Sequence, residues 1–384
     1  MSLQKKITII SYVFNLSNTV RAYAVYDSLK SEYETQVLYA DYDHYSKQYV
    51  TFDNKNFKSI HVPGYKKNIS LMRMVSTVLF GIKSLQYLKR ARTDFVYVVC
   101  PPNFGAFLVS FFCKKTNIPC IIDIVDLHPE SIPLSNKIKK IGDFFGLFLW
   151  KKFRNLAIKN ADEVIVECNY YKNFIASSFH DKVQTIYIAK QSNLQIVKFE
   201  TVREHEISIL YLGSIGHIYD FETLISLGRG LVKRNIPIKI HIIGDGEKRN
   251  WLIENLEVES IPYIYYGKIF EESNKKKIME MCDFGFNGFK DETSVGLSYK
   301  SLDYMDYGLA LINSTKEDTW NLINENQAGL NYFADDVDSL INNLVNLAPE
   351  DVLLMKKNSR KLFEKYFDRR VFESSIRKKM KELI

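Results

Sequence analysis

The chain has 384 residues, of which 46% are apolar and 25% charged, a composition that indicates a folded protein and excludes a largely disordered one. A single hydrophobic core rarely serves more than about 250–300 residues, so the length predicts two domains. The formal net charge of +7 suits an anionic ligand or a membrane surface, and over this length it is too small an excess to indicate a nucleic-acid-binding protein.

The cysteines indicate a reduced compartment. There are five, an odd number, and no two have the spacing of a redox or zinc motif. The N-terminus leads directly into a strand-like run without signal-peptide features, and no apolar stretch predicts a membrane span. We therefore expect a cytoplasmic protein, peripheral at the inner membrane surface if its substrate is a lipid, with no metal and no cofactor.

Short apolar runs alternate with helical patterns along the whole chain. The expected strands of the first half are 7–10, 35–39, 94–100, 120–125 and 163–168, and those of the second half are 207–212, 238–243, 263–266, 283–286 and 310–313. Continuous apolar strands separated by helices predict parallel sheets that are covered on both faces. The fold class is therefore α/β, with two Rossmann-like doubly wound domains.

The domain boundary is expected where the apolar periodicity lapses, at 191–206. This gives an N-terminal domain over 1–190 and a C-terminal domain over 207–365. The tail from Pro349 onward reads as helical, and we expect its last part, 366–384, to pack back on the first domain. Open parallel sheets bind ligands beyond the C-terminal ends of their strands, so the cleft between the two domains is the expected site.

Glycine positions exclude two common nucleotide motifs. The first glycine is Gly64, so no glycine-rich turn follows the first strand, and no P-loop is present. In the second domain, Gly213, Ser214 and Gly216 follow the strand 207–212. Glycines there let backbone N–H groups approach an anion closely. A tight turn without a ligand is the alternative.

The segment 294–308 predicts a polar loop and then a helix that begins near Ser298. Lys300 falls in the first turn, where a cation opposes the helix dipole, so its position is better explained if it faces an anion. Asp303 lies three residues later on the same face. The pair could bind a diphosphate and ribose hydroxyls, and the alternative is a solvated Lys–Asp pair.

Three polar residues follow the strand 120–125 in the first domain: Asp126, His128 and Glu130. We expect them to project toward a substrate. A histidine can donate to a sugar hydroxyl or assist proton transfer near neutral pH. The alternative is a capped strand end whose turn is shaped by Pro129.

Four segments resemble, in the right order, the bacterial surface-polysaccharide branch of glycosyltransferase family 4, and the resemblance covers nearly the whole chain. They are Asp-Leu-His-Pro-Glu-Ser at 126–131, the glycine turn at 212–216, Gly-Asp-Gly-Glu-Lys-Arg at 244–249, and the helix pattern Lys-x-x-Asp-Tyr-x-x-x-Gly at 300–308. The resemblance implies the GT-B fold, in which two Rossmann-like domains face each other across a cleft. It also implies metal-independent, retaining transfer of a hexosyl group.

The roles that follow from the resemblance are these. The second domain would bind a nucleoside diphosphate sugar, and the first a saccharide linked to polyprenyl diphosphate. The implied catalytic residues are Asp126, His128, Glu130 and Lys300. The implied donor-binding residues are Gly213, Ser214, Gly216, Gly244, Asp245, Lys300, Ser301 and Asp303. Asn18 and Arg21 are the implied acceptor-binding residues, and Arg21 could meet the acceptor phosphate.

The chain departs from the family pattern at three places. Asp303 stands for a glutamate, Val295 replaces a second glutamate with Glu292 out of register, and the segment 15–21 replaces a Gly-Gly loop. Two alternatives therefore stay open: a non-hydrolysing nucleotide-sugar epimerase and a non-catalytic partner subunit of a glycosyltransferase.

Two segments combine an apolar helical stripe with flanking basic residues, a pattern typical of membrane-surface helices. The first has its stripe at 141, 144, 145, 148 and 149, and the second spans 71–92. For both, the alternative is an ordinary core helix with solvated ends.

Overall fold

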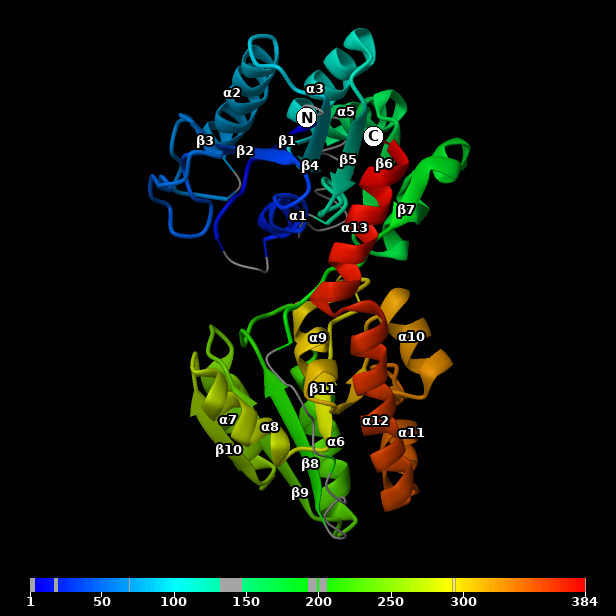
Figure 1. Cartoon of the computed structure of the whole chain (residues 1–384). Helices are drawn as coiled ribbons and strands as arrows, with labels where there is room; N and C mark the ends of the chain where they lie inside the picture. Colours follow the sequence, from blue (N-terminus) through cyan, green and yellow to red (C-terminus); the bar gives the residue numbers. More distant parts are fainter. Residues whose placement is uncertain are drawn as a thin grey trace. The chain divides into compact units, whose positions relative to one another are not determined.

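The computed structural model describes residues 4–16, 20–68, 70–131, 147–192, 199, 206–291, 293 and 295–383. The chain forms two compact units. Unit 1 comprises Met1–Lys190 and Arg369–Ile384, and unit 2 comprises Gln191–Asp368. Both termini therefore belong to unit 1 (Figure 1), and the chain passes from one unit to the other twice.

Unit 1 is built on a seven-stranded sheet with the order β3-β2-β1-β4-β5-β6-β7. All its strand pairs are parallel. The strands are β1 Lys6–Ser11, β2 Glu34–Ala40, β3 Phe57–Ile60, β4 Phe95–Cys100, β5 Cys120–Ile124, β6 Glu163–Val166 and β7 Val183–Thr185. The strand order reverses between β1 and β4, the switch point at which open α/β sheets bind ligands.

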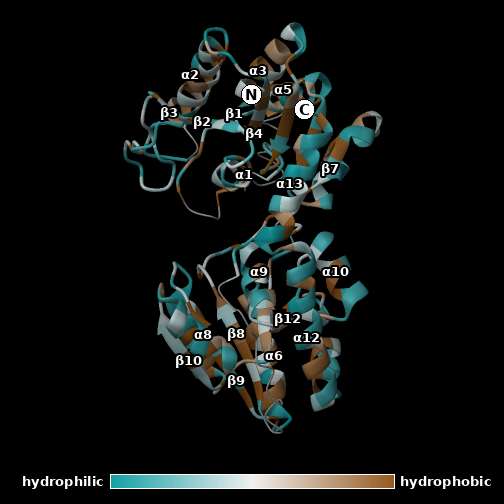
Figure 2. Ribbon diagram, in the orientation of Figure 1, coloured by the Kyte–Doolittle hydropathy of each residue, from teal (hydrophilic) through white to brown (hydrophobic). Residues whose placement is uncertain are grey.

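Helices cover both faces of this sheet. They are α1 Arg21–Leu29, α2 Leu71–Leu88, α3 Asn103–Thr116, α5 Phe148–Asn160 and α13 Arg369–Leu383, with 3-10 turns η2 Asn169–Phe174 and η3 Ser177–Lys182. Neighbouring strand residues point to opposite faces, so Ile9 belongs to the core beneath α1 and α13, while Ile10 belongs to the core beneath α2, α3 and α5. The strands are accordingly rich in apolar residues, although polar side chains such as Asp123 in β5 interrupt some of them. Figure 2 colours each residue of the ribbon by its hydropathy.

The C-terminal helix α13 packs against α1, the first helix of the chain. Its residues Phe372, Ile376 and Met380 are spaced by one helical turn and lie buried in the same core as α1. The Arg369 guanidinium donates to the carbonyl of Ala24 at 2.9 Å, and Arg377 donates to that of Ser28 at 2.8 Å. Arg377 thus binds a carbonyl in the last turn of α1, where the helix dipole favours a cation, and Arg369 binds one nearer the start of the helix.

Unit 2 contains a six-stranded parallel sheet with the order β10-β9-β8-β11-β12-β13. Its strands are β8 Ile207–Leu212, β9 Ile238–Ile243, β10 Tyr263–Gly267, β11 Phe284–Asn287, β12 Ala310–Asn313 and β13 Gly329–Asn331. Its helices are α6 Phe221–Lys233, α7 Arg249–Val258, α8 Glu272–Glu280, α9 Tyr299–Asp306, α10 Asp318–Asn326, α11 Val337–Val345 and α12 Pro349–Tyr366. The predicted fold class, two doubly wound Rossmann-like domains, is confirmed.

The predicted helical tail is two helices, α12 in unit 2 and α13 in unit 1. Between them the chain reaches unit 1 at Arg369, whose backbone N–H donates to the carbonyl of Lys190 at 3.1 Å. Within the described ranges, no helix combines the length and apolar character that a bilayer span requires.

Candidate functional site

Two glycine turns meet at the carboxyl edge of the unit 2 sheet. Gly213 follows β8 with φ of 133°, and Gly244 follows β9 with φ of 147°, a region that side chains disfavour. A Cβ on Gly244 would lie 1.8 Å from the carbonyl oxygen of Gly213. The two turns therefore pack backbone to backbone, and glycine at 244 is required by this contact.

The contact between the turns uses part of the amide set that the sequence predicted for anion binding. The N–H of Gly213 donates to the carbonyl of Ile243, and that of Ile215 donates to Asp245, both at 2.9 Å. The amides of Ser214 and Gly216 have no acceptor in the described part of the chain. The backbone N–H groups of this turn that could bind an anion are therefore limited to those of Ser214 and Gly216.

Asp245 serves the β9 turn itself. Its carboxylate accepts the N–H of Gly246 at 2.8 Å, and it lies 3.5 Å from Arg249 and 3.7 Å from Lys268. It therefore holds the turn and places two cations near the strand end.

Lys300 lies in an aromatic cage beside the Gly213 turn. Its Nζ is 3.7 Å from the ring centroid of Tyr219, 4.6 Å from that of Tyr211 and 4.8 Å from that of Phe289. The residue is only 8% exposed, and its Nζ has no hydrogen-bond partner in the residues that the structure describes. Burial lowers the pKa of the Lys300 ammonium well below its usual range.

This ammonium is the chemical feature of unit 2 that most needs a ligand. Aromatic faces attract a cation, yet a buried ammonium without an oxygen acceptor is costly to the protein. It lies beside β8, which pairs with β9 on one side and with β11 on the other, where the strand order reverses. An anion held by Lys300 and the two free amides would supply the missing partner.

The start of α9 is fixed by a polar network. Ser298 caps the helix by accepting the N–H of Ser301 at 3.2 Å, and its hydroxyl donates to Asn287 at 3.0 Å. The hydroxyl of Ser301 is buried and donates to the carbonyl of Ser298 at 2.6 Å. Ser301 thus stabilises the helix start that carries Lys300. Asp303 and Val295 are partly exposed, whereas Glu292 lies outside the described residues.

In unit 1, Asp126 and His128 form a pair beyond the end of β5. The Nε2 of His128 lies 2.7 Å from Oδ2 of Asp126, and Ser131 also donates to this carboxylate. Burial alone would raise the pKa of Asp126, but the hydrogen bonds from His128 and Ser131 outweigh it and leave that pKa lowered. A carboxylate that orients an imidazole is an arrangement suited to proton transfer.

Glu130 has a different environment from its two neighbours. Both its oxygens accept from the guanidinium of Arg154, at 2.7 Å and 3.0 Å, and Arg154 is almost fully buried. Arg154 also donates to the carbonyl of His128 at 3.2 Å. Glu130 therefore positions the turn that carries His128, through Arg154.

Arg21 is buried and paired rather than free. Its Nε donates to Asp123 at 2.7 Å, and Tyr97 donates to the same oxygen at 2.6 Å. One guanidinium nitrogen donates to the carbonyl of Tyr187, and the other, NH2, is buried and has no partner in the described ranges. Arg21 can therefore offer an acceptor phosphate only that one nitrogen. Asn18 lies outside the described residues.

Glu167, at the end of β6, is a residue that the sequence did not single out. Burial, with the nearby carboxylates of Asp123 and Asp126, raises its pKa to about 8 against the opposing effect of Arg21. No hydrogen bond or ion pair of its side chain occurs within the described chain. A neutral carboxyl at this strand end can donate a hydrogen bond, which an ionised one cannot.

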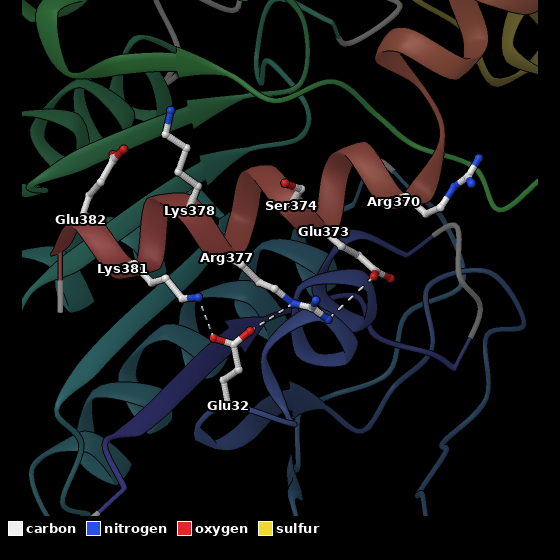
Figure 3. A pocket seen from close by; sticks show the side chains of 8 residues that line it. All are labelled: Glu32, Arg370, Glu373, Ser374, Arg377, Lys378, Lys381 and Glu382. Carbon is white, nitrogen blue, oxygen red and sulfur yellow. Dashed lines mark ion pairs between the residues drawn. The ribbon is translucent and has the colours of Figure 1, made fainter.

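An open hollow also lies on the outer side of α13 in unit 1 (Figure 3). Glu32 lies 3.5 Å from Arg377 and 3.3 Å from Lys381, and Arg377 is 3.9 Å from Glu373. These ion pairs attach α13 to Glu32, which lies just beyond the end of α1. Within the described chain, no group of three or more histidine, cysteine or acidic residues is arranged to hold a metal ion.

The chain matches no protein-family model and no curated protein. Solved structures match it over their full length. Sucrose-phosphate synthase of Thermosynechococcus elongatus has a TM-score of 0.71 at 11% identity, covering 99% of both chains. A glycosyltransferase of Rickettsia africae has 0.68 at 14% identity, covering 99% of this chain and 98% of its own. Anabaena HepE, solved in complex with UDP, has 0.67 at 11% identity, covering 99% and 100%. The fold expected from the resemblance, GT-B, is thereby confirmed.

Proposed function

We propose that this chain is a glycosyltransferase that moves a hexosyl group from a nucleoside diphosphate sugar to a saccharide acceptor. One observation carries the proposal: the buried ammonium of Lys300 has no hydrogen-bond acceptor among the residues that the structure describes, and it lies beside a glycine turn at the strand-order switch of unit 2. The GT-B neighbours support it, because HepE was solved with UDP.

We assign the donor to unit 2. The diphosphate would accept hydrogen bonds from Lys300 and from the amides of Ser214 and Gly216, while Gly213, Gly244 and Asp245 shape the two turns. Asp303, on the same helix as Lys300, would accept from ribose hydroxyls. An anion beside Lys300 favours its charged form, so donor binding would raise the lowered pKa of this ammonium.

The chemistry follows from where charge develops. As the bond between the sugar and the diphosphate breaks, the leaving diphosphate gains negative charge. Donors that are already aimed at this charge, in a site shielded from water, can each contribute roughly 3–4 kcal/mol to transition-state stabilisation. We propose that Lys300 and the turn amides supply this stabilisation without a metal ion, and that the anomeric configuration is retained.

We assign the acceptor to unit 1. His128, oriented by Asp126, would assist proton transfer from the acceptor hydroxyl, and Glu130 would fix the turn through Arg154. The unpaired nitrogen of Arg21 would meet an acceptor phosphate. We propose a polyprenyl-diphosphate-linked saccharide of surface-polysaccharide synthesis, met at the cytoplasmic face of the membrane.

The donor site is tested by thermal shift with UDP, GDP, TDP and ADP. A nucleotide at about 100 times its Kd should add roughly 2.7 kcal/mol of apparent stability. We expect one nucleotide to do so with the natural chain and to lose the effect in Lys300→Met. Lys276→Met, which removes an exposed lysine of α8, should keep it. Equal shifts in both variants would remove Lys300 from the donor site.

Turnover distinguishes the remaining alternatives. Interconversion of the donor sugar without an acceptor would identify an epimerase. Slow nucleotide release that a lipid-linked acceptor accelerates would identify the transferase. Nucleotide binding without turnover across a panel of donors and acceptors would identify a non-catalytic subunit. The sequence feature that supports this alternative is Val295.

A further inference from the structure

Helix α2 of unit 1 buries a face made largely of small and polar residues and exposes a face of large apolar ones. Its buried residues are Ser76, Phe80, Gly81, Ser84 and Leu88, of which three are small or polar. Leu88 is its one buried aliphatic residue, and most of the other large aliphatic residues are exposed. A surface helix of a globular protein normally places its large apolar side chains on the core.

Specific contacts fix the inner face. Ser76 shares a hydrogen bond with the hydroxyl of Tyr12 at 2.7 Å in the buried interior. A Cβ on Gly81 would lie 2.7 Å from the Cα of Gly105 in α3, so the two helices pack with their backbones in close approach. The helix therefore cannot rotate its aliphatic side chains inward without losing this packing.

The outer face presents a continuous aliphatic stripe. Leu71, Val75, Val78 and Ile82 follow the spacing i, i+4, i+7 and i+11, and their exposed fractions are 80%, 46%, 37% and 37%. Met72 and Met74 extend the stripe at its N-terminal end, with exposed fractions of 50% and 44%. Contiguous exposed apolar patches of this kind mark surfaces that bind a partner.

The charge around the stripe identifies the partner. From residue 54 to residue 93 the chain has nine lysines and arginines and no aspartate or glutamate. Lys66 and Lys67 are exposed just before α2, and Lys89, Arg90 and Arg92 are exposed just after it. An aliphatic stripe with cations at both ends fits an anionic lipid surface, where the side chains enter the acyl boundary and the cations meet head groups. A second copy of the chain would bring two basic sets together.

We propose that the outer face of α2 docks unit 1 on an anionic membrane surface, with the helix lying in the plane of the interface. Its 18 residues extend about 27 Å, enough to lay the whole stripe along that plane. The inference deepens the proposed function, on which it rests for the lipid-linked acceptor that would place the enzyme at a membrane. To the proposed function it adds which face of unit 1 binds the membrane and that the bound lipids are anionic.

The test is co-sedimentation of the full chain with vesicles, without donor or acceptor. We expect binding to vesicles of equal parts phosphatidylglycerol and phosphatidylcholine, weakening in high salt, and little binding to phosphatidylcholine alone. The triple variant Leu71→Ser, Val75→Ser, Val78→Ser should bind at least about tenfold more weakly. Neutralising Lys66, Lys67 and Lys89 to glutamine should remove the preference for anionic vesicles.

A matched control removes three apolar residues of unit 2 that are at least as exposed: Val258→Ser, Phe270→Ser, Leu354→Ser. It should bind vesicles as the natural chain does. Failure of the natural chain to bind anionic vesicles would overturn the proposal, as would undiminished binding by the α2 variant. A dimer that this variant converts to monomer would show that the face instead pairs two copies. Nucleotide thermal shifts should be unchanged in every variant, so the two proposals fail separately.

Discussion

At the scale of single residues, the buried ammonium of Lys300, which we propose binds the donor, also lowers the stability of the folded chain. Its pKa is lowered well below its usual value of 10.5, so between the lowered pKa and 10.5 the unfolded chain binds the extra proton. The stability of the natural chain should therefore rise with pH across that window, because the unfolded state binds more protons there than the folded state does.

Lys300→Met removes the cost, because a thioether needs no acceptor in the aromatic cage. Without nucleotide we expect the variant to be more stable than the natural chain by roughly 1–3 kcal/mol at neutral pH. The difference should shrink as the pH approaches 10.5. Urea unfolding at several pH values measures it. A variant less stable than the natural chain at neutral pH would show that the ammonium is already satisfied.

Glu167 gives the opposite pH dependence. Its pKa is raised from 4.5 to about 8, so in that window the folded chain binds the extra proton, and stability contributed by Glu167 falls as the pH rises. Glu167→Gln, a neutral isostere, should abolish this fall. Because the side chain is partly exposed, we expect a gain of only about 1 kcal/mol near pH 8.

Urea unfolding of both chains from pH 5 to 9 provides the measurement for Glu167. Parallel pH profiles for the two chains would mean that Glu167 is ionised in the folded state. Glu163→Gln is a suitable control, because Glu163 begins the strand that Glu167 follows and pairs with Lys379 at 3.6 Å.

At the scale of elements, the contact between the turns after β8 and β9 depends on Gly244. Gly244→Ala would place a methyl group 1.8 Å from the carbonyl of Gly213 and strain a φ of 147°. We expect a loss of about 2–4 kcal/mol together with loss of nucleotide binding, because the turn beside Lys300 must move.

Gly267→Ala is the matched control for this turn. Gly267 also has a positive φ, of 68°, but a Cβ there meets nothing within 4 Å. It should cost only about 1 kcal/mol and leave nucleotide binding intact. Unfolding and thermal-shift measurements on both variants separate the backbone strain from the clash; equal effects on binding would contradict the assigned role of the turn.

The strands show how much of the secondary structure the sequence patterns could predict. The central strands are mainly apolar, and all ten expected runs correspond to observed strands. The three strands that the sequence missed, β3, β7 and β13, are short and carry polar or glycine residues. Polar residues are tolerated at the ends of a sheet, where one side lacks a partner strand, so their periodicity is weak.

The site was predictable only in part. The cap at Ser298 and the turn glycines follow from local chemistry. The cage of Tyr211, Tyr219 and Phe289 around Lys300 does not, because two of its three rings, Tyr211 and Tyr219, come from a segment some 80 to 90 residues away along the chain. Likewise, the pairing of Arg21 with Asp123 spans 102 positions, and Asp123 sits inside an otherwise apolar strand.

At the scale of the whole molecule, unit 1 depends on the last fifteen described residues of the chain. Ending the chain after Asp368 would remove α13 and uncover the core around Val25 and Leu29. Replacing a buried phenylalanine such as Phe372 by alanine typically lowers the free energy of unfolding by about 3–5 kcal/mol. We therefore expect the truncated chain to have an unfolded or loosened unit 1.

Unit 2 contains none of the removed residues and should keep its structure. Limited proteolysis measures this outcome: a protected fragment covering about 206–368 is expected, with unit 1 degraded. The nucleotide-induced thermal shift should persist in the truncated chain. Protection of residues before Lys190 to the same degree as in the full chain would contradict the prediction.

The second crossing, at Asp368–Arg369, also sets an order in time. A ribosome delivers β1 to β7 first, yet α13, which packs on the same sheet face as α1, emerges only after all of unit 2. A nascent chain would therefore hold a finished unit 2 and a unit 1 with one face only partly covered, by α1. The earlier part of the polypeptide matures later, and its uncovered face is where a chaperone would find a target during synthesis.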